Sequence, residues 1–306
     1  MKVLRNSERA ILAKPFLKWA GGKKQLLKEI AKRLPQELIE GKITKYVEPF
    51  LGGGAVFFYI AQTFNATLKE FYLFDINSDL TNCFKAVKND VESLIGELLV
   101  IQDKFLKLSS DKRKEFYLKM RKKFNAEKSQ GFTTATAAKM IFLNKTCFNG
   151  LYRVNRKGEF NVPFGDYKRP KICDKKNLLA VSEVLQKAEI ICGDFTHCRE
   201  YIDKKTFVYF DPPYRPISRT ASFTSYTKED FSAEDQIKLA EFCKRLNKKG
   251  VRFILSNSDP KNEDKNDHFF EDNYFKFHID RVKASRVINC KGSGRGSINE
   301  LLITNY

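Results

Sequence analysis

Short apolar runs that end at an acidic residue or a turn recur along this chain, with helical patterns between them. Such bounded apolar runs are typical of buried strands, and their alternation with helices is typical of an α/β sheet. Strands are predicted at residues 45–50, 71–75, 189–194, 206–211, 251–256, 274–279 and 300–304. Helices are predicted at residues 24–33, 55–62 and 233–246, the last with Ser232 as N-cap and Gly250 just past its end. A glycine-rich turn at Gly292, Gly294 and Gly296 precedes the last strand.

The pattern changes between residues 81 and 187, where helical periods lead into a polar stretch with few strand signals. Residues 112–128 carry eight Lys or Arg against two acids, and residues 152–176 carry eight against three. The whole chain has a formal charge of +19, which indicates a polyanionic partner, although basic composition also aids solubility. We therefore predict one α/β domain built from residues 1–80 and 188–306, with a basic, mainly helical insert at residues 81–187.

Several classes of protein are disfavoured by the composition. The seven cysteines are odd in number and form no C-x-x-C pair, and the three histidines form no ligand spacing with them. We therefore expect no disulfide framework and no metal site, in a reducing cytoplasm. Apolar runs stay well below the roughly 20 residues of a membrane span, and residues 1–13 resemble no signal peptide.

Three glycines, Gly52 to Gly54, follow the first predicted strand and precede a helical pattern. Glycine at such a turn lets the backbone approach a ligand closely, but the spacing is not G-x-G-x-x-G, which disfavours a nicotinamide cofactor. Asp75 ends the next strand, where a carboxylate can accept hydrogen bonds from ribose hydroxyls. The competing interpretation is a tight turn with a helix-capping aspartate.

A second motif, Asp211-Pro212-Pro213-Tyr214, follows the strand predicted at residues 206–211. Prolines end the strand pairing and donate no hydrogen bond, so nearby carbonyls remain as acceptors beside a carboxylate and an aromatic ring. Acceptors and a stacking ring together suit the exocyclic amino group of a flat base. The competing interpretation is a proline-rich turn with a packed tyrosine.

Two further stretches stand outside the strand pattern. Residues 16–24 hold the only tryptophan and a Gly-Gly-Lys, but the spacing of a phosphate-binding loop is missing, which disfavours an ATPase. Residues 148–165 interleave aromatics, Asn and Arg with glycines. This composition is typical of a loop that reads bases, since Arg can bind guanine and apolar groups can meet the thymine methyl, or else of a solvated surface loop.

The chain resembles the Dam-type (α-class, D12) DNA adenine-N6 methyltransferases from about residue 14 to residue 306. The motifs that carry the resemblance occur in this order: FLKWAGGK, EPFLGGG, FDINSDL, RVNRKGEFNVPFG, DPPY and FTSYTKEDF. The resemblance implies a Rossmann-like methyltransferase fold, S-adenosyl-L-methionine as cofactor and double-stranded GATC as the site. It also allows a separately acting cognate restriction endonuclease as a partner, without deciding between restriction, phage defence and genome marking.

The resemblance also assigns site residues. For the cofactor it implies Trp19, Lys23, Glu48, Gly52, Gly54, Asp75, Asp194 and Asp211. For catalysis it implies Asp211, Pro212, Pro213 and Tyr214. For DNA recognition it implies Lys18, Phe148, Asn149, Leu151, Arg153 and Pro163. Phe148 stands where a related enzyme has an intercalating tyrosine, so stacking is retained and the hydroxyl contact is lost.

The implied mechanism begins with flipping the adenine out of the duplex, because the stack hides its N6. Asp211 and a proline carbonyl then accept the N6 hydrogens and aim the nitrogen lone pair at the methyl group, with no metal or covalent intermediate. Three alternatives remain: methylation of RNA adenine, methylation of cytosine N4, and a DNA-binding module without catalysis. Cytosine enzymes more typically carry Ser in place of Asp211, and pure binding does not require the intact motif.

Overall fold

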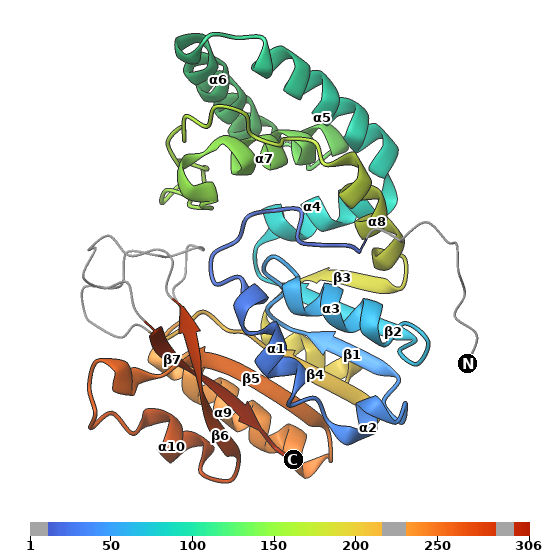
Figure 1. Cartoon of the computed structure of the whole chain (residues 1–306), viewed down its shortest axis with the longest axis vertical. Coiled ribbons are helices and arrows are strands. Elements are labelled where there is room, and N and C mark those ends of the chain that lie inside the picture. The colour runs from blue at the N-terminus through green and yellow to red at the C-terminus, as the bar shows by residue number, and fades with distance from the viewer. Residues whose placement is uncertain (1–11, 216–230, 286–296) are drawn as a thin grey trace.

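The computed structural model describes residues 12–215, 231–285 and 297–306. A seven-stranded sheet in the order β3-β2-β1-β4-β5-β7-β6 forms the lower half of the molecule in Figure 1. Its strands are β1 (Lys45–Glu48), β2 (Glu70–Asp75), β3 (Ala188–Cys192), β4 (Thr206–Phe210), β5 (Arg252–Ser258), β6 (His278–Ser285) and β7 (Ser297–Thr304). Strands β1 to β5 pair in parallel, and β7 runs antiparallel to both of its neighbours. The fold is therefore the predicted Rossmann-like α/β fold of methyltransferases.

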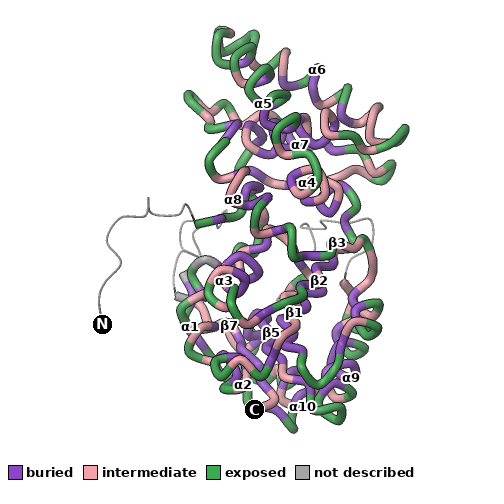
Figure 2. The backbone as a smooth tube through the Cα atoms, turned by 90° about the vertical axis from the view of Figure 1, so that its right-hand side faces the viewer, coloured by how far each residue is buried: buried purple, intermediate pink, exposed green. Residues whose placement is uncertain are grey.

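Both faces of the sheet are covered, as Figure 2 shows with the strands between helices on either side. Alternate residues of each strand point to opposite faces, so Tyr209 belongs to one hydrophobic cluster while Val208 and Phe210 belong to another. Every residue of β4 is buried, as expected of a central parallel strand. The shorter helices around the sheet are η1 (Lys23–Gln25), α1 (Leu27–Ala31), α2 (Gln36–Ile39), α3 (Ala55–Thr63), η3 (Phe195–Tyr201), η4 (Pro260–Asn262) and α10 (Phe269–Tyr274).

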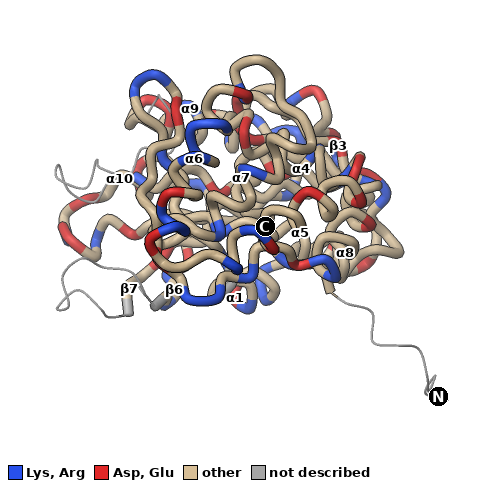
Figure 3. Tube along the Cα trace, turned by 90° about the horizontal axis from the view of Figure 1, so that it is seen from above, with Lys and Arg blue, Asp and Glu red and all other residues tan. Residues whose placement is uncertain are grey.

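The longer helices divide between the sheet and the upper half of Figure 1. Helix α9 (Ala233–Lys248) covers the sheet and begins with a capping box between Ser232 and Asp235. The upper half holds α5 (Val91–Leu106), α6 (Ser110–Lys128) and α7 (Thr134–Thr146), followed by η2 (Phe148–Gly150). Lys and Arg segments of α6 are visible in blue in Figure 3.

Helices α4 (Ser78–Asn89) and α8 (Lys175–Leu185) lie between the sheet and the upper helices, and α4 contacts α7, α8 and β3. One hydrophobic cluster runs through this junction, since it contains both Tyr46 of β1 and Phe142 of α7. The boundary predicted at residue 81 falls inside α4, and the division into two domains stays a prediction. In the parts of the chain that the structure describes, no helix is long and apolar enough to cross a membrane.

Two predicted elements are wrong in detail. The strand predicted at residues 274–279 is the end of α10 followed by a turn, and β6 begins only at His278. Phe270 and Tyr274 are one helical turn apart and their rings stack 5.9 Å apart, which favours a helix over an extended chain. The helix predicted at residues 24–33 is split into η1 and α1. The turn at Gly292, Gly294 and Gly296 and residues 223–230 of FTSYTKEDF lie outside the described residues.

Candidate active site

A cavity of about 820 Å³ opens at the carboxyl ends of β1 to β4. Open parallel sheets bind ligands at this edge, because the turns that follow neighbouring strands meet there. The cavity brings together most of the predicted site residues: Lys18, Trp19, Lys23, Glu48, Gly52, Gly54, Asp75, Asn149, Asp194, Asp211, Pro212, Pro213 and Tyr214. Four predicted recognition residues lie outside its lining: Phe148, Leu151, Arg153 and Pro163.

Asp211 follows β4 directly and is held by donors from two directions. The Lys23 ammonium lies 2.7 Å from Oδ1, and the Ser256 hydroxyl donates to the same oxygen at 2.9 Å. Tyr209 in turn lies 3.0 Å from the Ser256 hydroxyl. Burial raises the pKa of Asp211 above its ordinary value, while the charge of Lys23 lowers it. The arrangement fixes the orientation of a carboxylate inside the cavity.

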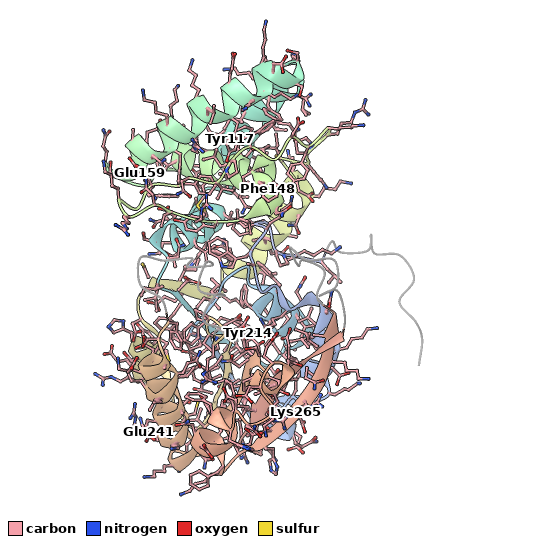
Figure 4. All side chains as sticks on the ribbon, turned by 90° about the vertical axis from the view of Figure 1, so that its left-hand side faces the viewer. Tyr117, Phe148, Glu159, Tyr214, Glu241 and Lys265 are labelled. Atoms are coloured by element: carbon pink, nitrogen blue, oxygen red, sulfur yellow. The ribbon has the colours of Figure 1, made fainter. Side chains whose placement is uncertain are left out.

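Tyr214 presents its ring to the same point. Its hydroxyl donates to Glu300 of β7 at 2.6 Å, which fixes the ring plane. The Lys23 ammonium lies 4.6 Å from the ring centroid and also donates to the Gly21 carbonyl at 2.7 Å. Lys23 therefore covers a face of Tyr214 beside Asp211. Figure 4 shows Tyr214 in the sheet half of the molecule and Phe148 in the helical half.

The glycine turn after β1 is shaped by close contacts. Gly52 and Gly54 have φ of +49° and +72°, in the left-handed region that side chains disfavour. A Cβ added to Gly52 would lie 3.1 Å from the Trp19 ring, so the indole rests on the turn. Asp75 accepts the Gly52 N–H and the Asn77 N–H, each at 2.9 Å. The Asp75 carboxylate thus fixes the turn from the end of the neighbouring strand.

Helix α4 is capped by Asn77, whose side chain accepts the Leu80 N–H, so capping does not require Asp75. Burial raises the pKa of Asp75, although its two amide donors oppose the shift. Asp194 is the side-chain cap of η3 and accepts the backbone N–H and the hydroxyl of Thr196. Both carboxylates nevertheless line the cavity, and their assignment to a cofactor stays a prediction.

Glu48 is a buried carboxyl at the end of β1. The Tyr46 hydroxyl donates to its Oε2 at 2.6 Å. Burial raises the pKa of Glu48 well above its ordinary value, the bond from Tyr46 opposes the shift, and the nearby Asp211 charge adds to it. Burial and the Asp211 charge thus disfavour the ionised form of Glu48, and the Tyr46 hydroxyl favours it.

Residues 153–161 form a hairpin-like segment, which we call the recognition hairpin. Val154 and Phe160 pair across it, and the Arg153 guanidinium donates to the Asn161 side chain at 2.8 Å. Helix α6 holds it, because the Asn125 side chain bonds both backbone groups of Phe160. Tyr117 and Arg121 of α6 donate to the Val162 carbonyl just beyond the hairpin. Arg153 itself is exposed, on a backbone that α6 holds in place.

The segment before the hairpin meets the N-terminal motif. The backbone of Lys18 forms two hydrogen bonds with the Asn144 side chain of α7. The Lys18 side chain lies against Gly150, where a Cβ would come within 2.2 Å of Cδ. Asn149 has a φ of 54°, and Phe148 is 51% exposed. The segment therefore places Lys18 and Asn149 in the lining of the cavity, with Phe148 directly before Asn149 in the chain.

Sequence reasoning missed Ser256, Glu300 and Ile76. Ser256 reaches the site because β5 pairs with β4, and Glu300 reaches it because β7 lies on the other side of β5. This strand order is not visible in the apolar pattern. Ile76 lines the cavity and is 53% exposed. The place of Ile76 directly after β2 was visible in the sequence, but its exposure to the cavity was not.

Known proteins resemble the chain over most of its length. A family model described as D12 class N6 adenine-specific DNA methyltransferase matches residues 19–288. The chain is 55% identical over 294 residues to type II methyltransferase M.MjaIII of Methanocaldococcus jannaschii, covering 96% of this chain and 99% of that protein. It is 40% identical to type II methyltransferase M1.LlaDCHI of Lactococcus lactis, covering 96% and 95%. It is 35% identical to a DNA adenine methylase of Vibrio cholerae, covering 94% of each.

Proposed function

The chain belongs to the D12 class of N6 adenine-specific DNA methyltransferases, and from this premise we propose a specific reaction for it. The proposed methyl donor is S-adenosyl-L-methionine, and the acceptor is N6 of an adenine flipped out of double-stranded GATC. The observation that carries the proposal is the Asp211 carboxylate, held beside the Tyr214 ring in a cavity of about 820 Å³. The carboxylate, the Pro212 carbonyl and the ring together match the needs of an adenine amino group.

The residues around the cavity fit the proposed cofactor. The glycine turn lets the Trp19 ring pack directly against the backbone at Gly52. Trp19 and Ile76 supply apolar surface to the cavity, and Asp75 and Asp194 supply acceptors. When bound, the cofactor supplies an electrophilic methyl group. Asp75 is proposed to accept hydrogen bonds from its ribose hydroxyls, in addition to the two amides that it already orders.

On the acceptor side, Asp211 and the Pro212 carbonyl are proposed to accept the two N6 hydrogens while Tyr214 stacks on the base. These bonds localise the nitrogen lone pair and stabilise the positive charge that develops on N6. Lys23 must first leave the face of Tyr214, because its ammonium lies 2.7 Å from Asp211 Oδ1. The incoming amino group then replaces Lys23 as a donor to Asp211.

The proposed GATC specificity is supported by the exposed groups beside the cavity. Arg153 and Lys18 match family positions that contact guanines, Leu151 and Pro163 match positions near the thymine methyls, and Asn149 matches a duplex contact. Arg153 and Lys18 are both exposed. The Arg153 guanidinium contacts the Asn161 side chain, and the Lys18 ammonium lies 4.4 Å from the Tyr167 ring centroid. Phe148, half exposed, is proposed to fill the space that the flipped adenine leaves.

We expect Asp75→Ala to weaken cofactor binding about tenfold. A hydrogen bond to a charged acceptor contributes about 1.5–3 kcal/mol to binding. Asp75 also accepts from the Gly52 and Asn77 amides, so only part of this free energy is available to the cofactor. Calorimetry with S-adenosylhomocysteine measures the affinity. Asp203→Ala is the matched control, because Asp203 also accepts a backbone N–H but lies at the opposite end of β4. Equal affinities for the wild-type chain and Asp75→Ala would leave Asp75 with a purely structural role.

The function itself is tested by incubating the chain with radiolabelled S-adenosylmethionine and each of three substrates: a GATC duplex, a scrambled duplex and an RNA duplex. We expect label only in the GATC duplex, recovered as N6-methyladenine after digestion. Label in RNA would favour the RNA enzyme, and label recovered as N4-methylcytosine would favour the cytosine enzyme. Binding to all duplexes without label would reduce the chain to a DNA-binding module.

A further inference from the structure

Tyr152 lies between two predicted DNA-recognition residues, Leu151 and Arg153, but its side chain is buried at 6% exposure. Its ring stacks on Trp19, with centroids 5.2 Å apart and planes 28° apart. Trp19 lines the cavity and rests on the glycine turn at Gly52. Tyr152, directly before the recognition hairpin, therefore contacts the wall of the cavity.

The hydroxyl of Tyr152 is fixed as firmly as its ring. It donates to Asp79 Oδ2 at 2.6 Å, and the Lys128 ammonium of α6 lies 2.6 Å from the same oxygen. Asp79 is 7% exposed and sits in the first turn of α4, just after Asp75 and Asn77 of the cavity wall. Breaking such a buried hydrogen-bonded pair is costly, so Tyr152 moves together with α4 and α6.

The contact continues from Tyr152 into the recognition hairpin. The rings of Tyr152 and Phe160 lie 5.8 Å apart, and Phe160 meets Phe124 of α6 at 6.3 Å. We call Trp19, Tyr152, Phe160 and Phe124 the aromatic column. Phe160 precedes Asn161, the partner of Arg153, so the column supports both sides of the hairpin at its base.

We propose that Tyr152 is a positioning residue that couples cofactor binding in the cavity to DNA binding by the recognition hairpin. The proposal rests on the function proposed above. A ligand that orders Trp19 also orders Tyr152, because close-packed rings have few alternative arrangements. The hairpin then loses less conformational freedom when DNA binds, and by linkage DNA strengthens cofactor binding by the same factor.

A merely structural role for Tyr152 makes a different prediction, and Tyr117 provides the control for it. Tyr117 is also fully buried, and its hydroxyl donates to the Val162 carbonyl beside the recognition hairpin. It belongs to α6 and is not part of the cavity lining. Tyr117→Phe therefore weakens the support of the hairpin without touching the path to the cavity.

The experiment measures S-adenosylhomocysteine binding by calorimetry, alone and with a saturating GATC duplex. We expect the duplex to tighten binding at least about fivefold in the wild-type chain, within the usual range of coupling between two sites. In Tyr152→Leu the duplex should tighten binding less than about twofold. In Tyr152→Phe the increase should lie between those of Tyr152→Leu and the wild-type chain, and Tyr117→Phe should keep the wild-type value. Trp19 is the only tryptophan of the chain, so its fluorescence gives a second reading. The emission change on adding DNA should be lost in Tyr152→Leu.

Absence of coupling in the wild-type chain, or full coupling in Tyr152→Leu, would overturn the proposal. If Tyr152→Leu does not fold, Tyr152→Phe is compared with Tyr117→Phe. If the duplex tightens S-adenosylhomocysteine binding by the same factor in these two variants, the proposal is overturned. Failure of S-adenosylhomocysteine to bind under any condition would contradict the proposed function instead. Because turnover is not measured, the two failures are distinguishable.

Discussion

We expect replacement of Asp211 by asparagine to lower the methylation rate on a GATC duplex by about 10²–10³-fold, the usual cost of removing one well-placed electrostatic contact. Asparagine keeps the size of the side chain and one acceptor oxygen, but its amide nitrogen donates where the carboxylate accepted. The positive charge on N6 then also loses its counter-charge. Single-turnover rates with bound cofactor and duplex measure the effect on the chemical step.

The matched control for Asp211→Asn is Ser256→Ala, which removes one donor to the same oxygen and leaves the carboxylate in place. We expect Ser256→Ala to reduce the rate far less, because the charged carboxylate that is proposed to accept from N6 is unchanged. Both variants should melt as cooperatively as the wild-type chain and bind duplex DNA. Near-wild-type turnover in Asp211→Asn would rule out the proposed role of the carboxylate.

The second large effect is expected for Arg153→Ala. A bidentate contact between Arg and guanine is worth about 1–3 kcal/mol of discrimination, which corresponds to roughly 5- to 150-fold in rate on the cognate site. Activity on GATC should fall by a factor in this range, while activity on duplexes that lack that guanine changes little. Methylation of GATC and its single-base variants at two salt concentrations measures this selectivity.

Lys122→Ala is the control for Arg153→Ala, since Lys122 is an exposed cation of α6. A phosphate contact at Lys122 would weaken binding to all sequences alike and lower the salt slope by about one. If Arg153→Ala reduces activity equally on every site, Arg153 is also a backbone contact, and the assignment of the recognition hairpin fails.

Much of the candidate site was predictable because of a property of parallel sheets. Asp75 ends a strand, and the glycine turn, Asp194 and Asp211 each follow one. The carboxyl ends of parallel strands share one edge of the sheet. Recognising the strands was therefore enough to predict that these residues meet. The apolar runs located six of the seven strands, although their ends moved by a few residues.

The remaining contacts depend on tertiary packing that local patterns do not encode. Ser256 reaches Asp211 only because β5 pairs with β4, and Glu300 reaches Tyr214 only because β7 lies beside β5. The stack of Trp19 on Tyr152 joins residues from opposite ends of the first half of the chain. The strand predicted at residues 274–279 failed because aromatic residues suit both a strand and the buried face of α10.

Adenine-N6 methylation at GATC is tested by sequencing the modified bases of a plasmid from cells that express the chain. The host lacks other adenine methylation, and cells expressing Asp211→Asn provide the control. We expect N6-methyladenine on both strands at GATC sites, none at other adenines, and none with Asp211→Asn. Methylated cytosine, methylation spread over unrelated adenines, or an unmodified plasmid in the presence of the folded wild-type chain would contradict it.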